Sequence, residues 1–152
     1  MNDLDFTQKL PKTLLRPYQT ELIEKCKAVD FYGLFLSVGL GKTITMGTVI
    51  ADLNLRTLIV STPRICDFVW EVELSAWEHT AGLSVSNLHV APKKRKALLG
   101  AQVLLISFDL LDWFIKQNCH VDMIIVDESS LIKNSSSKRY KNLRKPRFAP
   151  WP

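Results

Sequence analysis

Four short apolar runs, separated by segments with helical spacing, dominate the pattern of the chain. They lie within Tyr32 to Leu36, Arg56 to Thr62, Val103 to Ile106 and Met123 to Val126. Uninterrupted apolar runs of this length are typical of strands buried on both faces of a parallel sheet. Helical stripes alternate with them, and the clearest are Tyr18, Leu22, Cys26 and Val29, and then Met46, Ile50 and Leu53. This alternation predicts an α/β fold with a parallel sheet and helices on both faces.

Turn residues and weaker patterns add detail to this expectation. Asn54 is a plausible end for the second helix. Trp70, Leu74 and Trp77 share one helical face, which favours core packing over a stacking platform. We also expect a short strand at Asn87 to Val90 and a short basic helix at Pro92 to Leu99. Ser107 is a candidate helix cap, and one of Ser135, Ser136 and Ser137 a candidate cap for a final basic helix.

Length and composition limit the class of protein. With 152 residues and 47% hydrophobic composition, the chain is expected to form one domain. It has no apolar stretch near the roughly 18 residues that a membrane span requires, and its acidic N-terminus lacks a signal-peptide core. A soluble, cytoplasmic protein without membrane partners is therefore expected. The three cysteines and three histidines are scattered without C-x-x-C spacing, which argues against a disulfide or zinc framework.

The net charge of +5 is unevenly placed. Seven of the 20 basic residues and no acid lie between Lys133 and Arg147, so 13 basic and 15 acidic residues remain elsewhere. Such a run can bind nucleic acid or can simply cover a solvated helix face, and both interpretations stay open. The smaller cluster from Lys93 to Lys96 has the same two interpretations. Any nucleic-acid affinity is expected mainly in Lys133 to Arg147.

Two motifs indicate nucleotide chemistry. Gly39, Leu40, Gly41, Lys42 and Thr43 follow the first apolar run and open a helical pattern, so their backbone N–H groups can surround a phosphate at a helix N-terminus. Lys42 would reach the outer phosphates, and the Thr43 hydroxyl would ligate Mg²⁺.

The second motif closes the last apolar run with two carboxylates, Asp127 and Glu128. Asp127 is a candidate for the Mg²⁺ shell, and Glu128 for orienting or deprotonating the attacking water. The two motifs together indicate a nucleotide with Mg²⁺, and the candidate catalytic residues are Lys42, Asp127 and Glu128.

Further motifs in matching order resemble the superfamily-two helicases, in particular their Swi/Snf-like branch of DNA-dependent ATPases. The segment from Leu15 to Gln19 is similar to the family's glutamine motif, Leu58 to Arg64 to its first nucleic-acid motif, and Leu105 to Phe108 to the next. Ile124 to Glu128, followed by Ile132-Lys133-Asn134, resembles the DExx box and I-K-N sequence. The resemblance covers about residues 14–145, between an N-terminal extension (1–13) and a Pro-rich tail (146–152).

This resemblance implies the first, RecA-like lobe of a nucleic-acid motor, present only in part. It implies that ATP with Mg²⁺ is the cofactor and that Gln19, beside Arg16, reads adenine. It also implies that four residues touch the phosphate backbone of DNA, with RNA as the second choice: Ser61, Thr62, Arg64 and Ser107. For Ser61 and Ser107, strand-end and capping hydrogen bonds are an equal alternative. Leu36 stands where a full Walker A motif has glycine, a change that removes no phosphate ligand.

The sequence ends before the family's Thr motif and its second, arginine-finger lobe. It therefore predicts weak nucleotide binding and negligible hydrolysis by this chain alone. Three hypotheses stay open: a split motor completed by a second polypeptide, a non-enzymatic module or decoy that engages DNA or a protein partner, and a remnant with no independent role.

We call Gly39 to Thr43 the P-loop. In the family's sheet, the strand that carries the Thr motif lies between the strand before the P-loop and the strand that ends at the DExx box. Its absence here predicts one of three outcomes. The strands at Tyr32 to Leu36 and Met123 to Val126 close on each other, a partner supplies the missing strand, or the domain is only marginally stable.

Overall fold

The computed structural model describes residues 8–30, 32–34, 36–37, 39–127 and 136–143. It divides into two compact units, one made of Met1–Asn54 and Val69–Leu83 and the other of Leu55–Phe68 and Ser84–Pro152. We call them the first and the second unit. Among the described residues no helix is long and apolar enough to cross a membrane.

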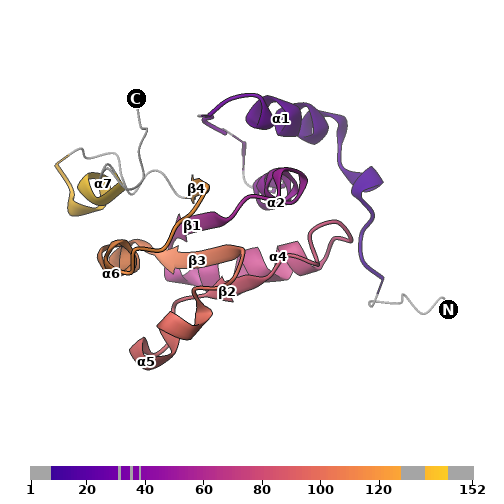
Figure 1. Cartoon of the computed structure of the whole chain (residues 1–152). Helices are drawn as coiled ribbons and strands as arrows, with labels where there is room; N and C mark the ends of the chain where they lie inside the picture. The colour runs from indigo at the N-terminus through magenta and orange to yellow at the C-terminus, as the bar shows by residue number, and fades with distance from the viewer. Residues whose placement is uncertain (1–7, 31, 35, 38, 128–135, 144–152) are drawn as a thin grey trace. The chain divides into compact units, whose positions relative to one another are not determined.

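The first unit is helical (Figure 1). Its α1 packs against α2, and α2 packs against α4. The bounds of its elements are η1 Lys12–Leu14, α1 Pro17–Lys27, α2 Lys42–Leu53 and α4 Glu71–Ser75. The side chains of Trp70, Leu74 and Trp77 are at most 8% exposed, which confirms that this aromatic stripe belongs to the core.

Helix α2 begins and ends at residues with left-handed backbone. Gly41 precedes it with φ +72°, and Asn54 ends it with φ +50°, a conformation that Asn adopts more readily than most residues with a side chain. The predicted stop at Asn54 is therefore confirmed.

The second unit contains a four-stranded parallel sheet with strand order β2-β3-β1-β4. Figure 1 shows these strands together with the helical segments of the unit. The element bounds are β1 Thr57–Ser61, α3 Pro63–Ile65, β2 Val85–Asn87, α5 Pro92–Arg95, η3 Lys96–Leu98, β3 Val103–Ser107, η4 Phe108–Leu110, α6 Leu111–Lys116, β4 Met123–Val126 and α7 Lys138–Leu143. A π-helical turn, η2 Cys66–Trp70, follows α3 and leads into α4. The parallel α/β class is thus confirmed.

Strands β1 and β3 are buried at every position, whereas β4 is only half-buried. Among the described residues β4 pairs with β1 along one edge and has no strand on the other. An apolar strand with an open edge leaves unpaired N–H and C=O groups.

Two sequence predictions need correction. The described residues of the Tyr32 to Leu36 run, 32–34 and 36, form no strand, because a strand requires hydrogen bonds from a neighbour and the described strands pair only with one another. The short strand expected at Asn87 to Val90 ends at Asn87 instead, since the Asn87 side-chain oxygen accepts the His89 N–H at 3.0 Å and turns the chain.

A half-buried histidine, His79, makes the stability of the first unit depend on pH. Thr48 Oγ1 donates its single proton to the Ile44 carbonyl at 2.8 Å, so it must accept from His79 Nε2 at 2.9 Å. The other ring nitrogen of His79 is buried without a partner among the described residues. Burial, reinforced by Lys12 and opposed by Asp52 and Glu78, lowers the pKa of His79.

We expect neutral His79 to stabilise the first unit fully above pH 6.5, the ordinary pKa, and this contribution to be lost as pH falls through the lower folded pKa. Urea unfolding of the wild type and of His79→Gln between pH 7.5 and pH 5 measures it. The free energy of unfolding should fall more steeply toward pH 5 in the wild type, because glutamine keeps an N–H donor but does not titrate. If the free energy of unfolding changed equally with pH in the two proteins, the assignment of this pH dependence to His79 would be wrong.

Candidate functional site

The P-loop residues of the first unit form a left-handed turn ahead of a helix. Gly39 and Gly41 have φ of +82° and +72°, and Lys42 is the first residue of the 12-residue helix α2. Thr45 fixes the turn, since its N–H and its hydroxyl both donate to the Gly41 carbonyl, at 3.0 and 2.8 Å. The free N–H groups of a helix N-terminus attract anions, so the turn can receive a phosphate.

Lys42 and Thr43 carry the two side chains assigned to phosphate and Mg²⁺. Lys42 and Thr43 are half-buried, and neither has a hydrogen bond or ion pair among the described residues. A half-buried ammonium and hydroxyl at a helix N-terminus suit a phosphate and a hard divalent cation. The chemistry of this end of α2 therefore fits ATP with Mg²⁺.

Gln19 and Tyr18 hold the P-loop turn from α1. The Gln19 side chain is 6% exposed; its carbonyl oxygen accepts the Arg16 N–H at 2.8 Å, and its amide donates to the Leu40 carbonyl at 3.4 Å. The Tyr18 hydroxyl donates to the same Leu40 carbonyl at 3.0 Å. The structure thus brings together Arg16, Gln19 and the P-loop, and the Gln19 amide stabilises the loop through its hydrogen bond to Leu40.

Sequence reasoning missed the role of Tyr18 in this contact. The only available signal was its place beside Gln19 in the Leu15 to Gln19 segment. A hydroxyl at that position cannot be assigned a partner until the fold places Leu40 against α1.

The second unit carries the remaining candidates at the carboxyl ends of its parallel strands. Ser61 and Ser107 are register partners at the ends of β1 and β3, and Asp127 follows β4 with its N–H donating to the Val60 carbonyl at 2.9 Å. Parallel strands place their carboxyl ends at one edge of the sheet, where ligands of α/β proteins bind. Glu128, the other carboxylate of the DExx motif, lies outside the described residues.

The four nucleic-acid candidates differ in accessibility. Ser61 is fully buried and Ser107 is 2% exposed, whereas Arg64 is exposed and Thr62 is half-buried. Thr62 caps α3, since its hydroxyl accepts the Ile65 N–H at 3.4 Å. Ser107 occupies the N-cap position of η4 without a side-chain capping bond. Only Thr62 and Arg64 present a surface that a ligand can reach in this structure.

A buried thiol lies beneath this edge. Cys66 has no exposed surface, and its sulfur donates to the Ile106 carbonyl at 3.4 Å. Burial, with the negative charges of Asp67 and Asp127, raises the pKa of Cys66 to about 12. The thiol therefore stays protonated and acts as a core residue. The described residues contain no cluster of His, Cys, Asp and Glu that could hold a metal by themselves.

The P-loop turn should tolerate a side chain at Gly39 better than at Gly41. Both residues have left-handed φ, which costs roughly 1–2 kcal/mol for a residue with a Cβ. A Cβ on Gly41 would also overlap Gln19 Nε2, whereas one on Gly39 meets nothing within 4 Å. We therefore expect Gly41→Ala to lower the free energy of unfolding more than Gly39→Ala, as measured in urea without nucleotide.

A double-mutant cycle tests the cause. Adding Gln19→Ala should remove the excess loss in Gly41→Ala and leave Gly39→Ala unaffected. Equal losses at both glycines, or no coupling with Gln19, would show that the contact between α1 and the P-loop turn is absent.

Comparison with known proteins gives this arrangement a family. The sequence profile of the SNF2-related domain matches residues 23–148. A solved structure, the Sulfolobus solfataricus SWI2/SNF2 ATPase core in complex with dsDNA, is similar over 85% of this chain with a TM-score of 0.73 and 24% sequence identity.

The chain spans only 29% of the length of that archaeal chain, and at this identity the likeness shows the fold alone. A search of curated proteins found no match. The profile match covers most of the sequence, from α1 to beyond α7. The chain belongs to the SNF2-related domain family.

Proposed function

We propose that this chain is the ATP-binding part of a nucleic-acid-dependent ATPase of the Swi/Snf type. The observation that carries the proposal is the N-terminal end of α2. A left-handed glycine turn held by α1 presents Lys42 and Thr43 without competing partners among the described residues. Membership of the SNF2-related family supports ATP as the nucleotide.

The proposed roles follow the chemistry of each side chain. Lys42 would contact the outer phosphates as a point charge. Thr43 is the candidate Mg²⁺ ligand of the first unit, and Asp127 is the candidate of the second. Bound Mg²⁺ would neutralise the charge of the phosphates. Glu128, beside Asp127 in the sequence, would position the attacking water.

DNA is the proposed partner, and RNA is the second choice. The similar archaeal structure is a complex with dsDNA, which supports the first. Thr62 and Arg64 are the accessible contacts at the carboxyl edge of the sheet, and a hydroxyl and a single cation suit backbone contacts better than base reading. Contacts by Ser61 and Ser107 would require these buried side chains to become accessible.

Turnover by these residues alone is expected to be very slow. The assigned site contains a phosphate-binding lysine and two carboxylates but no assigned arginine finger, which is worth roughly 10³ to 10⁵ in turnover. Within the described part of the chain one edge of β4 has no neighbouring strand, which is consistent with an additional strand from another segment or chain. A non-enzymatic binding module is the alternative, and DNA binding that is indifferent to both ATP and Lys42 would favour it.

Replacement of Lys42 tests the nucleotide site. Lys42→Ala should weaken ATP–Mg²⁺ binding at least tenfold, or about 1.4 kcal/mol, because Lys42 is the only basic residue in the sequence from Gly39 to Thr43. Isothermal calorimetry measures the affinity. Lys9→Ala, which removes an exposed lysine of the same unit, is the matched control and should bind like the wild type. Equal affinity in Lys42→Ala and the wild type would refute the P-loop assignment.

A further inference from the structure

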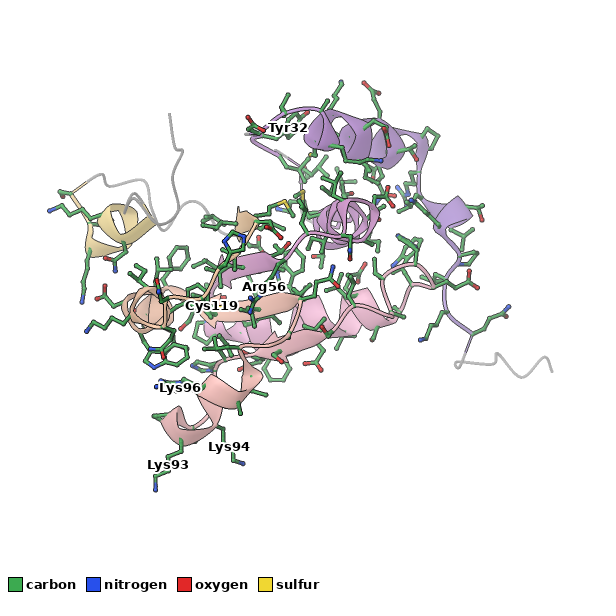
Figure 2. All side chains as sticks on the ribbon, viewed as in Figure 1. Tyr32, Arg56, Lys93, Lys94, Lys96 and Cys119 are labelled. Carbon is green, nitrogen blue, oxygen red and sulfur yellow. The ribbon has the colours of Figure 1, made fainter. Side chains whose placement is uncertain are left out.

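Three exposed lysines gather on a short helical segment of the second unit. Lys93 and Lys94 lie on α5, and Lys96 begins η3. Figure 2 shows their side chains extending away from the ribbon. The stretch from Val90 to Ala101 contains no acidic residue, so the segment carries only positive charge.

The fourth basic residue of this cluster has a different task. Arg95 Nε donates to the carbonyls of Leu88 and Val90, at 3.2 and 3.0 Å, and its guanidinium lies 5.7 Å from the centre of the Trp113 ring. Leu88 is fully buried, so Arg95 fastens the segment to the core of the unit. The cluster therefore consists of Arg95, which holds the segment in place, and three exposed lysines.

The lysines are also available for an external anion. None of the three forms an ion pair among the described residues. Lys12, Lys25, Lys27 and Lys138 differ, since each lies within 3.2 Å of a carboxylate oxygen. Lys138 belongs to the Lys133 to Arg147 run, so part of that run's charge is already balanced by Asp112.

The sheet topology places this segment at the same edge as the accessible nucleic-acid candidates. Strand β2 is parallel to β3 and β3 to β1, so the carboxyl ends of all three face the same way. The chain leaves β2 at this edge and enters α5, just as it leaves β1 to enter α3 with Thr62 and Arg64. One elongated polyanion along the edge could therefore meet both segments.

The side-chain chemistry favours the backbone of duplex nucleic acid. Lysine is a point charge suited to phosphate, and Arg95, which could read a base with two hydrogen bonds, is turned inward. Sites for single strands use exposed aromatic rings for stacking. The stretch from Val90 to Ala101 has none, and the nearby Trp113 ring lies against Arg95.

We propose that Lys93, Lys94 and Lys96 form a separate contact for the phosphate backbone of duplex DNA, independent of sequence and beyond the motif residues Ser61, Thr62, Arg64 and Ser107. This proposal rests on the proposed function insofar as DNA is the partner. It moves part of the expected affinity from the Lys133 to Arg147 run to the second unit's α5 segment.

The test is fluorescence anisotropy with a labelled duplex of mixed sequence, titrated with the full chain at several salt concentrations. The triple variant Lys93→Ala/Lys94→Ala/Lys96→Ala should bind at least tenfold more weakly at low salt. Its plot of log affinity against log salt should be shallower by about 2 to 3, since each phosphate contact contributes about 0.9 to the slope. Replacing the same three lysines with arginine should preserve binding.

A second triple variant, Lys9→Ala/Lys25→Ala/Lys116→Ala, removes the same charge from exposed positions elsewhere and should bind nearly as the wild type does. Equal loss in the two alanine variants would refute the placed contact and leave only a net-charge effect. Competition by polyglutamate as effective as that by unlabelled duplex would refute the phosphate backbone as the ligand. A wild-type chain that binds no duplex would overturn both this proposal and the DNA partner, whereas unchanged binding in the first variant would overturn this proposal alone.

Discussion

Strand β1 is hydrogen-bonded along both of its edges, and the second unit is organised around it. Its register with β3 and β4 sets which residues meet at the carboxyl edge of the sheet. Arg56 fixes the opposite edge, because its N–H donates to the Asp122 carboxylate at 2.8 Å and its carbonyl accepts the Asp122 N–H at 2.7 Å. With β1 fastened at this end, the position of Asp127 follows from the ladder and not from a flexible loop.

The parts of the fold that depend on local chemistry were predictable from the sequence. Pro17 begins α1, Asn54 ends α2, and the apolar run from Val103 to Ile106 in β3 indicates a buried strand, because neighbouring residues decide each of these features. The Tyr32 to Leu36 run looked equally strand-like. Its state depends on a hydrogen-bonding partner distant in the sequence, and a pattern of side chains contains no information about that partner.

Some features of the candidate site could likewise be predicted from the sequence, and others could not. The spacing from Gly39 to Thr43 was enough to place a turn before a helix, and the structure has one there. It was not enough to show that Gln19 is buried against that turn or that Ser61 is hidden from solvent. Nor could it show which of four successive basic residues turns inward, because Trp113 and the Leu88 carbonyl reach Arg95 only after the chain has folded.

The burial of Cys66 has a practical consequence for following this protein in solution. With that thiol inert in the core, the remaining sulfhydryls are Cys26 and Cys119, both partly accessible. Cys26 lies in the first unit and Cys119 in the second. The natural sequence thus provides one attachment point for a dye or spin label on each unit. The distance between the P-loop unit and the sheet unit could then be measured by energy transfer or dipolar spectroscopy, with and without ATP, without engineering new cysteines.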